Sequence, residues 1–239
     1  RAGADRASEA VAGETGEAAG VNAREGVGLI DLGRGLDEDE AVENAKDPHF
    51  WRDPQRAKRS VRNIAAGLAD LAPEAEETIE ANRSALEADL DALDADWQST
   101  FEAADREVVF LAAHNAFGYV ADRYGATIEP LVVNLAASGD VRPADMRRAQ
   151  ETIAANGIRH IGAAVFEPIR PAKQLREQTD VRAYFPVTPY AGTAESWVER
   201  GWGYFDIARE VNLPTFRILL GIDSPEDVGF ADYGRNFEP

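Results

Sequence analysis

The alternation of strand-like and helical segments beyond residue 106 constrains the fold of this chain more than any other feature. Short runs rich in Val, Ile, Phe and Ala, such as 108–112 and 158–166, are separated by segments whose apolar residues recur at helical spacing. Strands that alternate with helices favour βαβ units and a mostly parallel sheet with right-handed crossovers. The sequence therefore predicts an α/β lobe over residues 106–221, with a mostly parallel four-stranded sheet flanked by helices.

The individual elements of this lobe follow from the same pattern, with Gly125 and Gly157 as helix ends. We expect the strands at 108–112, 128–133, 158–166 and 181–187, and the helices at 116–124, 143–156, 172–179 and 195–211. Residues 222–239 are expected to form an irregular tail.

Two helices are predicted before this lobe. Asp53 and Pro54 are typical of a helix start, and Pro73 begins a second helical pattern. If continuous over 74–103, the second helix would be about 45 Å long at about 1.5 Å per residue. Its length and acidic outer face suit either a linking helix, assigned to residues 73–105, or an ordinary long surface helix. Upstream, residues 27–32 resemble one short strand, and an acidic loop follows.

The charge and composition exclude several classes of function. The chain has 43 acidic and 25 basic residues and a formal net charge of −18, so nucleic acid is not an expected partner. The acidic surface and scarce lysine suit either a salt-loving source or a GC-rich genome. There is no cysteine, which excludes disulfides and thiolate chemistry. No apolar run approaches the ~20 residues of a membrane span.

Two of the three histidines, His49 and His114, and one glutamate, Glu167, are the candidate metal-binding residues. His114 follows the first predicted strand and Glu167 ends the third, so both should lie at the edge of the sheet where ligand sites collect. His49, in the loop before the first helix, could fold over the same edge. Two imidazoles and a carboxylate suit Zn²⁺, and Mn²⁺ with more oxygen ligands. The alternatives are a surface or capping His49 and a solvated Glu167; His160 is expected to be structural or exposed.

The chain lacks the local signatures of common enzymes. We find no nucleophile elbow, phosphate-binding loop or dinucleotide-binding glycine fingerprint. The aromatic residues between Trp197 and Phe205 are interpreted as core packing rather than as a platform for stacking a ligand.

Two longer motifs resemble a known family. Residues 47–54, Asp-Pro-His-Phe-Trp-Arg-Asp-Pro, and residues 114–119, His-Asn-Ala-Phe-Gly-Tyr, resemble the metal-binding motifs of the zinc/manganese-uptake ABC-transporter substrate-binding family. Asn82, the Arg-Tyr-Gly at 123–125 and the segment 203–213 add to the resemblance. It covers about residues 27–221, and in that family each of the two motifs donates one metal-binding histidine.

The resemblance implies a function and an architecture. It implies two α/β lobes joined by one long rigid helix, with Zn²⁺ or Mn²⁺ held between them by His49, His114 and a further ligand placed at Glu167. Such proteins are extracytoplasmic, are often membrane-anchored lipoproteins, and pass the ion to an ABC permease and its ATPase without catalysis. A monomer is expected. The readings left open are a metal-dependent hydrolase and an adhesion or interaction module that binds no metal.

The chain departs from the family pattern in two places. Only 46 residues, none of them histidine, precede the first motif, where the family has a longer lobe with another ligand. We therefore expect residues 1–72 to be a remnant of an N-terminal lobe, with the rest of that lobe and the anchor missing. Residues 187–190, Val-Thr-Pro-Tyr, stand where some members have a late aspartate ligand. A histidine-rich, zinc-type site fits this pattern better than a manganese-type site.

Overall fold

The computed structural model describes residues 20–32, 46–132, 141–226 and 228. The chain divides into two compact units. The first comprises Arg1–Gly28 and Pro54–Asp91, and the second comprises Leu29–Asp53 and Ala92–Pro239. The boundary falls within one helix, so the same helix contributes residues to both units.

The first unit is built on a pair of helices. Helix α2 (Pro54–Leu71) starts at the predicted proline, and a short 3₁₀ turn, η3 (Pro73–Ala75), leads into α3 (Glu76–Glu102). Pro73 ends the run of α2 because proline has no backbone N–H for a helix interior. The long helix predicted over 74–103 thus forms as one helix of 27 residues. Segment 20–28 is attached to α2 by Asn63, whose side chain donates to the carbonyls of Ala23 and Glu25 at 3.1 and 2.8 Å.

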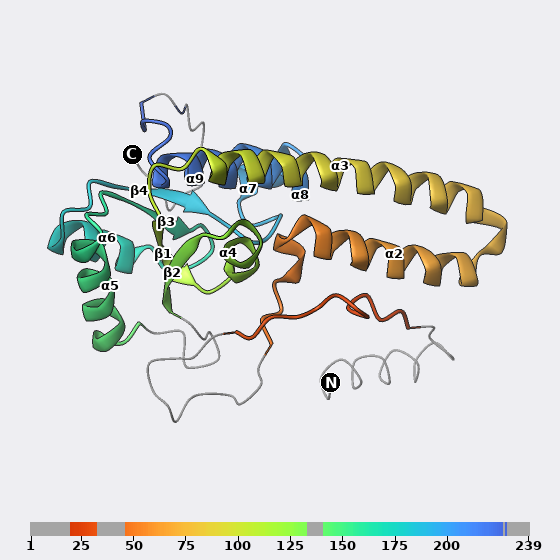
Figure 1. Cartoon of the computed structure of the whole chain (residues 1–239), viewed down its shortest axis with the longest axis horizontal. Helices are drawn as coiled ribbons and strands as arrows, with labels where there is room; N and C mark the ends of the chain where they lie inside the picture. Colours follow the sequence, from red (N-terminus) through yellow and green to blue (C-terminus); the bar gives the residue numbers. More distant parts are fainter. Residues whose placement is uncertain (1–19, 33–45, 133–140, 227, 229–239) are drawn as a thin grey trace. The chain divides into compact units, whose positions relative to one another are not determined.

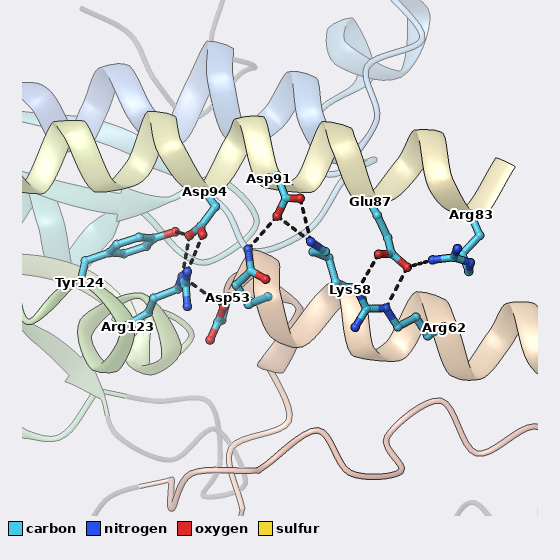
Figure 2. A network of polar contacts seen from close by, with 10 residues as sticks. Asp53, Lys58, Arg62, Arg83, Glu87, Asp91, Asp94, Arg123 and Tyr124 are labelled. Carbon is cyan, nitrogen blue, oxygen red and sulfur yellow. Dashed lines mark hydrogen bonds and ion pairs between the residues drawn. The ribbon is translucent and has the colours of Figure 1, made fainter. Parts of the chain in front are cut away.

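Ion pairs join α2 to the part of α3 that belongs to this unit (Figure 2). Arg62 donates to both carboxylate oxygens of Glu87 at 2.9 and 2.6 Å, and Arg83 also contacts Glu87. One turn further along, Lys58 donates to Asp91 at 2.7 Å. The hydrogen bond from Arg62, followed by that from Arg83, lowers the pKa of Glu87 to about 2.

The second unit contains the predicted parallel sheet. Its strands are β1 (Val108–His114), β2 (Thr127–Val132), β3 (His160–Ala164) and β4 (Ala183–Val187). Their order is β2-β1-β3-β4, and every neighbouring pair is parallel. The prediction of an α/β fold with a parallel four-stranded sheet is therefore confirmed.

Helices cover both faces of this sheet (Figure 1). Val109 and Leu111 of β1 pack with Trp97 of α3 and with Phe216 of α9 (Leu213–Leu219). Phe110 and Ala112 point to the opposite face and pack against the helices there. That face is covered by α5 (Pro143–Ala155) and α6 (Arg170–Gln178). This alternation is the two-residue period of a strand buried on both faces, which explains why β1 is apolar at every position before His114.

Two predicted elements are wrong. Segment 27–32 forms no strand among the described residues and contributes one isolated bridge, between Asp31 and Lys46. The single helix predicted over 195–211 is broken: α7 (Glu195–Glu199) ends at a turn that contains Gly201 at φ +70°. A new helical run then begins with α8 (Tyr204–Asp206), continues as a π-helical segment, η4 (Ile207–Asn212), and passes into α9. Trp197 and Trp202 stack across this break, with ring centroids 6.2 Å apart, so aromatic residues on both sides of the turn pack together.

Some predictions lie outside the described residues, including the acidic loop over 33–45 and most of the tail over 222–239. Within the described part of the chain, no helix is long and apolar enough to cross a lipid bilayer.

Candidate metal centre

The site lies in the second unit, at the carboxyl ends of β1 and β3. The chain continues from β1 to β2 on one side and to β3 and β4 on the other, so the strand order reverses between β1 and β3. Crevices for ligands form at such reversals in open α/β sheets. His114 is the last residue of β1, and Glu167 lies in the turn after β3. Both predicted residues are therefore at this edge.

His49 reaches the same edge from a loop that is fixed at several points. The backbone N–H of Asp47 donates to the carbonyl of Ile30 at 3.0 Å, and the Tyr119 hydroxyl donates to the Asp47 carbonyl at 2.7 Å. Tyr119 belongs to α4 (Gly118–Tyr124), the helix that follows β1. On the far side of His49, the indole of Trp51 donates to the Pro189 carbonyl at 3.1 Å, after β4. The loop is thus tied to both sides of the sheet edge.

The structure brings the two imidazoles together. Nε2 of His49 lies 3.4 Å from Nε2 of His114, and the ring centroids are 5.2 Å apart. Each histidine is only 5% exposed. Two histidines that are 65 positions apart in the sequence therefore meet in one small buried site.

A carboxylate holds the other nitrogen of each ring. Nδ1 of His49 lies 2.7 Å from Oδ1 of Asp47, which also accepts the His49 backbone N–H at 2.8 Å. Nδ1 of His114 likewise contacts Oε1 of Glu167. A carboxylate can only accept, so each neutral ring carries its proton on Nδ1 and its lone pair on Nε2. Two lone pairs then lie side by side, an arrangement that a shared cation stabilises.

Aromatic side chains line the site. The Tyr190 hydroxyl lies 3.2 Å from Nε2 of His49. The Tyr190 ring packs against Phe166 and Trp51, with centroids 5.3 and 6.1 Å apart. Burial, followed by the nearby charges of Glu167 and Asp47, raises the pKa of Tyr190. The phenol is therefore a hydroxyl donor at neutral pH.

The residues considered in the sequence analysis take different places in the structure. His49 and His114 present Nε2 to one point, whereas Glu167 contacts the opposite nitrogen of His114. His160 starts β3, at the other end of the sheet, where its ring packs edge-on against Phe185. Burial lowers the pKa of His160. Among the described residues, no group of three or more His, Asp or Glu side chains is arranged so that it could hold a metal ion.

Two residues of the site were missed by the sequence analysis. Asp47 stands two positions before His49, inside the motif, and its spacing from the histidine could have suggested a local contact. Its side chain is fully buried, and its second oxygen, Oδ2, has no hydrogen-bond partner. A Cβ atom added at Gly118 would lie 3.0 Å from that oxygen. The absence of a side chain at Gly118 therefore makes space for the Asp47 carboxylate. No local pattern marked Tyr190 itself, because it is 141 positions from His49 in the sequence; the family resemblance pointed only to its segment, 187–190, as the place of a late ligand.

Known proteins share this fold and sequence pattern. The zinc-binding protein AdcA of Streptococcus pyogenes serotype M6 is 30% identical over 190 residues, which cover 79% of this chain and 36% of AdcA. The high-affinity zinc uptake system protein ZnuA of Bacillus subtilis is 27% identical over 224 residues, covering 87% of this chain and 66% of that protein. The crystal structure of the metal-dependent lipoprotein YcdH from Bacillus subtilis superposes with a TM-score of 0.69 at 24% identity, over 86% of this chain and 72% of YcdH.

The match extends over most of the chain but not over the whole length of its relatives. This chain spans about a third of AdcA, at 36%. A family model described as the periplasmic component A of the zinc-uptake complex, ZnuA, matches residues 2–215, which include both histidine motifs and the entire sheet. The chain therefore belongs to the ZnuA family of substrate-binding proteins of metal-uptake ABC transporters.

Proposed function

We propose that this chain binds Zn²⁺ as cargo through Nε2 of His49 and Nε2 of His114, as the extracytoplasmic binding component of an ABC uptake system. The observation that carries the proposal is the distance between these two atoms. Two nitrogens bonded to one tetrahedral zinc ion at about 2.0–2.1 Å lie about 3.3–3.4 Å from each other. Their separation here is 3.4 Å. The ring atoms need little movement to accept the ion.

The two carboxylates beside the histidines support the same proposal. Histidines that bind metals usually donate their second ring nitrogen to a carboxylate, which fixes the tautomer and the ring orientation. Asp47 and Glu167 occupy these positions on His49 and His114. Two nitrogens leave the other positions of a tetrahedral ion to water or to further ligands. We propose that the ion is held between two lobes in the whole protein, as the family resemblance implies, and that Mn²⁺ binds more weakly than Zn²⁺.

Delivery to a membrane permease follows from the family relation rather than from the site. We propose that the chain works outside the cytoplasm with a permease and its ATPase, and that it performs no catalysis. A screen for hydrolysis of ester and phosphoester substrates by the zinc-loaded chain is expected to give no turnover. Turnover that depends on His49 would instead support a metal-dependent hydrolase.

Titration of the chain with Zn²⁺ and Mn²⁺ tests the ligand assignment. His49→Ala and His114→Ala should each weaken zinc binding by more than the roughly 10- to 100-fold that loss of a ligand's hydrogen-bond partner costs. His160→Ala is the matched control, because it removes the third histidine without touching the site, and it should leave affinity unchanged. Equal effects from all three variants, or no zinc binding by the wild type, would overturn the proposal.

The role of Glu167 needs its own variant. That Glu167 is itself a metal ligand stays a prediction; in the geometry described above, we propose that it orients His114. Glu167→Gln keeps an oxygen that can accept the Nδ1 proton but removes the negative charge. A loss of zinc affinity smaller than about 10-fold supports orientation, whereas a loss as large as that of His114→Ala indicates a direct ligand. Isothermal titration measures both.

A further inference from the structure

The hydroxyl of Tyr190 forms a hydrogen bond with Nε2 of His49, the nitrogen that we propose as a zinc ligand. When the His49 ring is neutral and its Nδ1–H donates to Asp47, Nε2 accepts, and the Tyr190 hydroxyl donates to it over 3.2 Å. An imidazole nitrogen has one lone pair in the ring plane, which serves either a hydrogen bond or a metal bond. We propose that Tyr190 is a gate residue that competes with the metal ion for His49, an inference that rests on the proposed zinc function.

The backbone beneath Tyr190 is anchored. Asn212 accepts the Thr188 N–H at 3.0 Å and donates to the Thr188 carbonyl at 2.9 Å, with Asn212 and Thr188 both fully buried. The Tyr190 N–H donates to the Thr188 hydroxyl at 3.2 Å, and that hydroxyl donates back to the Tyr190 carbonyl at 3.1 Å. The main chain therefore stays in place while the side chain moves.

The Tyr190 side chain is free to leave His49. Tyr190 is 36% exposed, whereas His49 and His114 are each 5% exposed, so the ring forms the outer wall of the site. Its neighbours on that wall are the rings of Phe166 and Trp51. Rotation about the side-chain bonds takes the hydroxyl from Nε2 into solvent without opening a cavity in the core.

Competition fits the chemistry better than coordination by Tyr190. Protein zinc sites are built from Cys, His, Asp and Glu, and a neutral phenol is a weak ligand beside them. The hydroxyl also presents its proton, rather than an oxygen lone pair, toward His49. Once an ion leaves, the same hydroxyl reoccupies Nε2, so the gate lowers affinity and favours release. Both properties suit a protein that must hand its cargo on.

Tyr190→Phe distinguishes the two roles by the sign of its effect. Phenylalanine keeps the ring packing and removes the competing hydrogen bond, which leaves Nε2 of His49 unpaired in the metal-free chain. Zinc affinity should therefore rise by about 2- to 10-fold, the range that corresponds to one net hydrogen bond. The apparent affinity is measured on the full chain by competition with a chromophoric chelator, with Zn²⁺ as the probe.

A matched control and a second measurement complete the test. Tyr184→Phe removes a hydroxyl from the amino-terminal half of β4, away from the site, and should leave zinc affinity unchanged. The visible spectrum of the chain loaded with Co²⁺ reports the ligand set, and it should be the same in the wild type and in Tyr190→Phe.

Unchanged or weaker zinc binding by Tyr190→Phe overturns the gate, and so does a changed Co²⁺ spectrum, which would make Tyr190 a ligand. A failure of the proposed function is distinguishable, because the wild type would then bind no zinc, or would bind it equally well after His49→Ala.

Discussion

The carboxylates of the helical pair in the first unit and those of the metal centre in the second unit differ in solvent exposure and in the partners that they bind. In the helical pair, Asp91 binds Lys58 with 53% of its side chain exposed, whereas Glu87, with 12% of its side chain exposed, binds Arg62, which is 50% exposed. In the metal centre, the Asp47 side chain has no exposure and its partner His49 has 7%. Water can replace a lost partner of Asp91 but not one of Asp47. The exposed pair of Lys58 and Asp91 should therefore contribute little by itself, whereas the buried carboxylate of Asp47 should be needed.

Among the tests of this comparison, removal of the buried Asp47 carboxylate should have the largest effect on zinc affinity and on stability. Asp47→Ala leaves the Nδ1–H of His49 without its acceptor and frees the ring to turn. Zinc affinity should fall by about 10- to 100-fold, and thermal stability should fall as well because a buried donor loses its partner. Asp31→Ala is the control: this aspartate pairs with Lys46, the residue next to Asp47, but its side chain is 72% exposed. Zinc affinity is measured by chelator competition and stability by thermal melts. Equal losses in Asp47→Ala and Asp31→Ala would contradict the special role of the buried carboxylate.

Gly118→Ala sharpens the same point without removing any polar group. The added carbon would lie 3.0 Å from Oδ2 of Asp47, so the carboxylate must shift by a few tenths of an ångström. Alanine also favours the helix, since it exceeds glycine in helix propensity. We expect zinc affinity to fall by up to about 10-fold, which is the smallest loss usually seen when the carboxylate partner of a metal-binding histidine is removed. Thermal stability should change little. Gly203→Ala, whose added carbon meets nothing closer than 3.9 Å, should bind zinc normally.

Acid should weaken the helical pair through Glu87. Hydrogen bonds from Arg62 and Arg83 lower the pKa of Glu87 from 4.5 to about 2. Because its pKa is lower in the folded state, Glu87 stabilises the fold fully above about pH 4.5, and that stabilisation is lost as the pH falls toward 2. Glu87→Gln should melt below the wild type at pH 7, and the difference should shrink as the pH approaches 2. Melts followed by circular dichroism measure this; a difference independent of pH would contradict the assignment.

Asp91→Asn should have the smallest effect. The carboxylate accepts from Lys58 and Gln55 at the surface, where solvent and salt screen the charge. We expect the melting temperature at neutral pH to change by less than about 2 °C, and high salt to reduce the difference further. A change as large as that of Asp47→Ala would show that exposure does not separate the two regions.

Much of the fold could be predicted because its signals are local. Helical spacing and prolines located α2 and α3, and apolar runs located the four strands within a few residues. The prediction failed over 195–211, where the chain turns at Gly201 between the stacked rings of Trp197 and Trp202. Periodicity records which residues are buried, and residues on two separate helices can be buried in the same register.

The sequence by itself determined the family, the parallel sheet and the pair of histidines, because motifs and apolar periods are properties of short segments. Only the tertiary structure decided which atom of each ring faces its partner. Asp47 and Glu167 bind Nδ1, which turns Nε2 of both rings to one point and leaves Glu167 on the opposite side of His114 from that point. It also brought Tyr190 to His49 across 141 residues. Such contacts depend on directions and distances of a fraction of an ångström, which arise only when distant segments pack together.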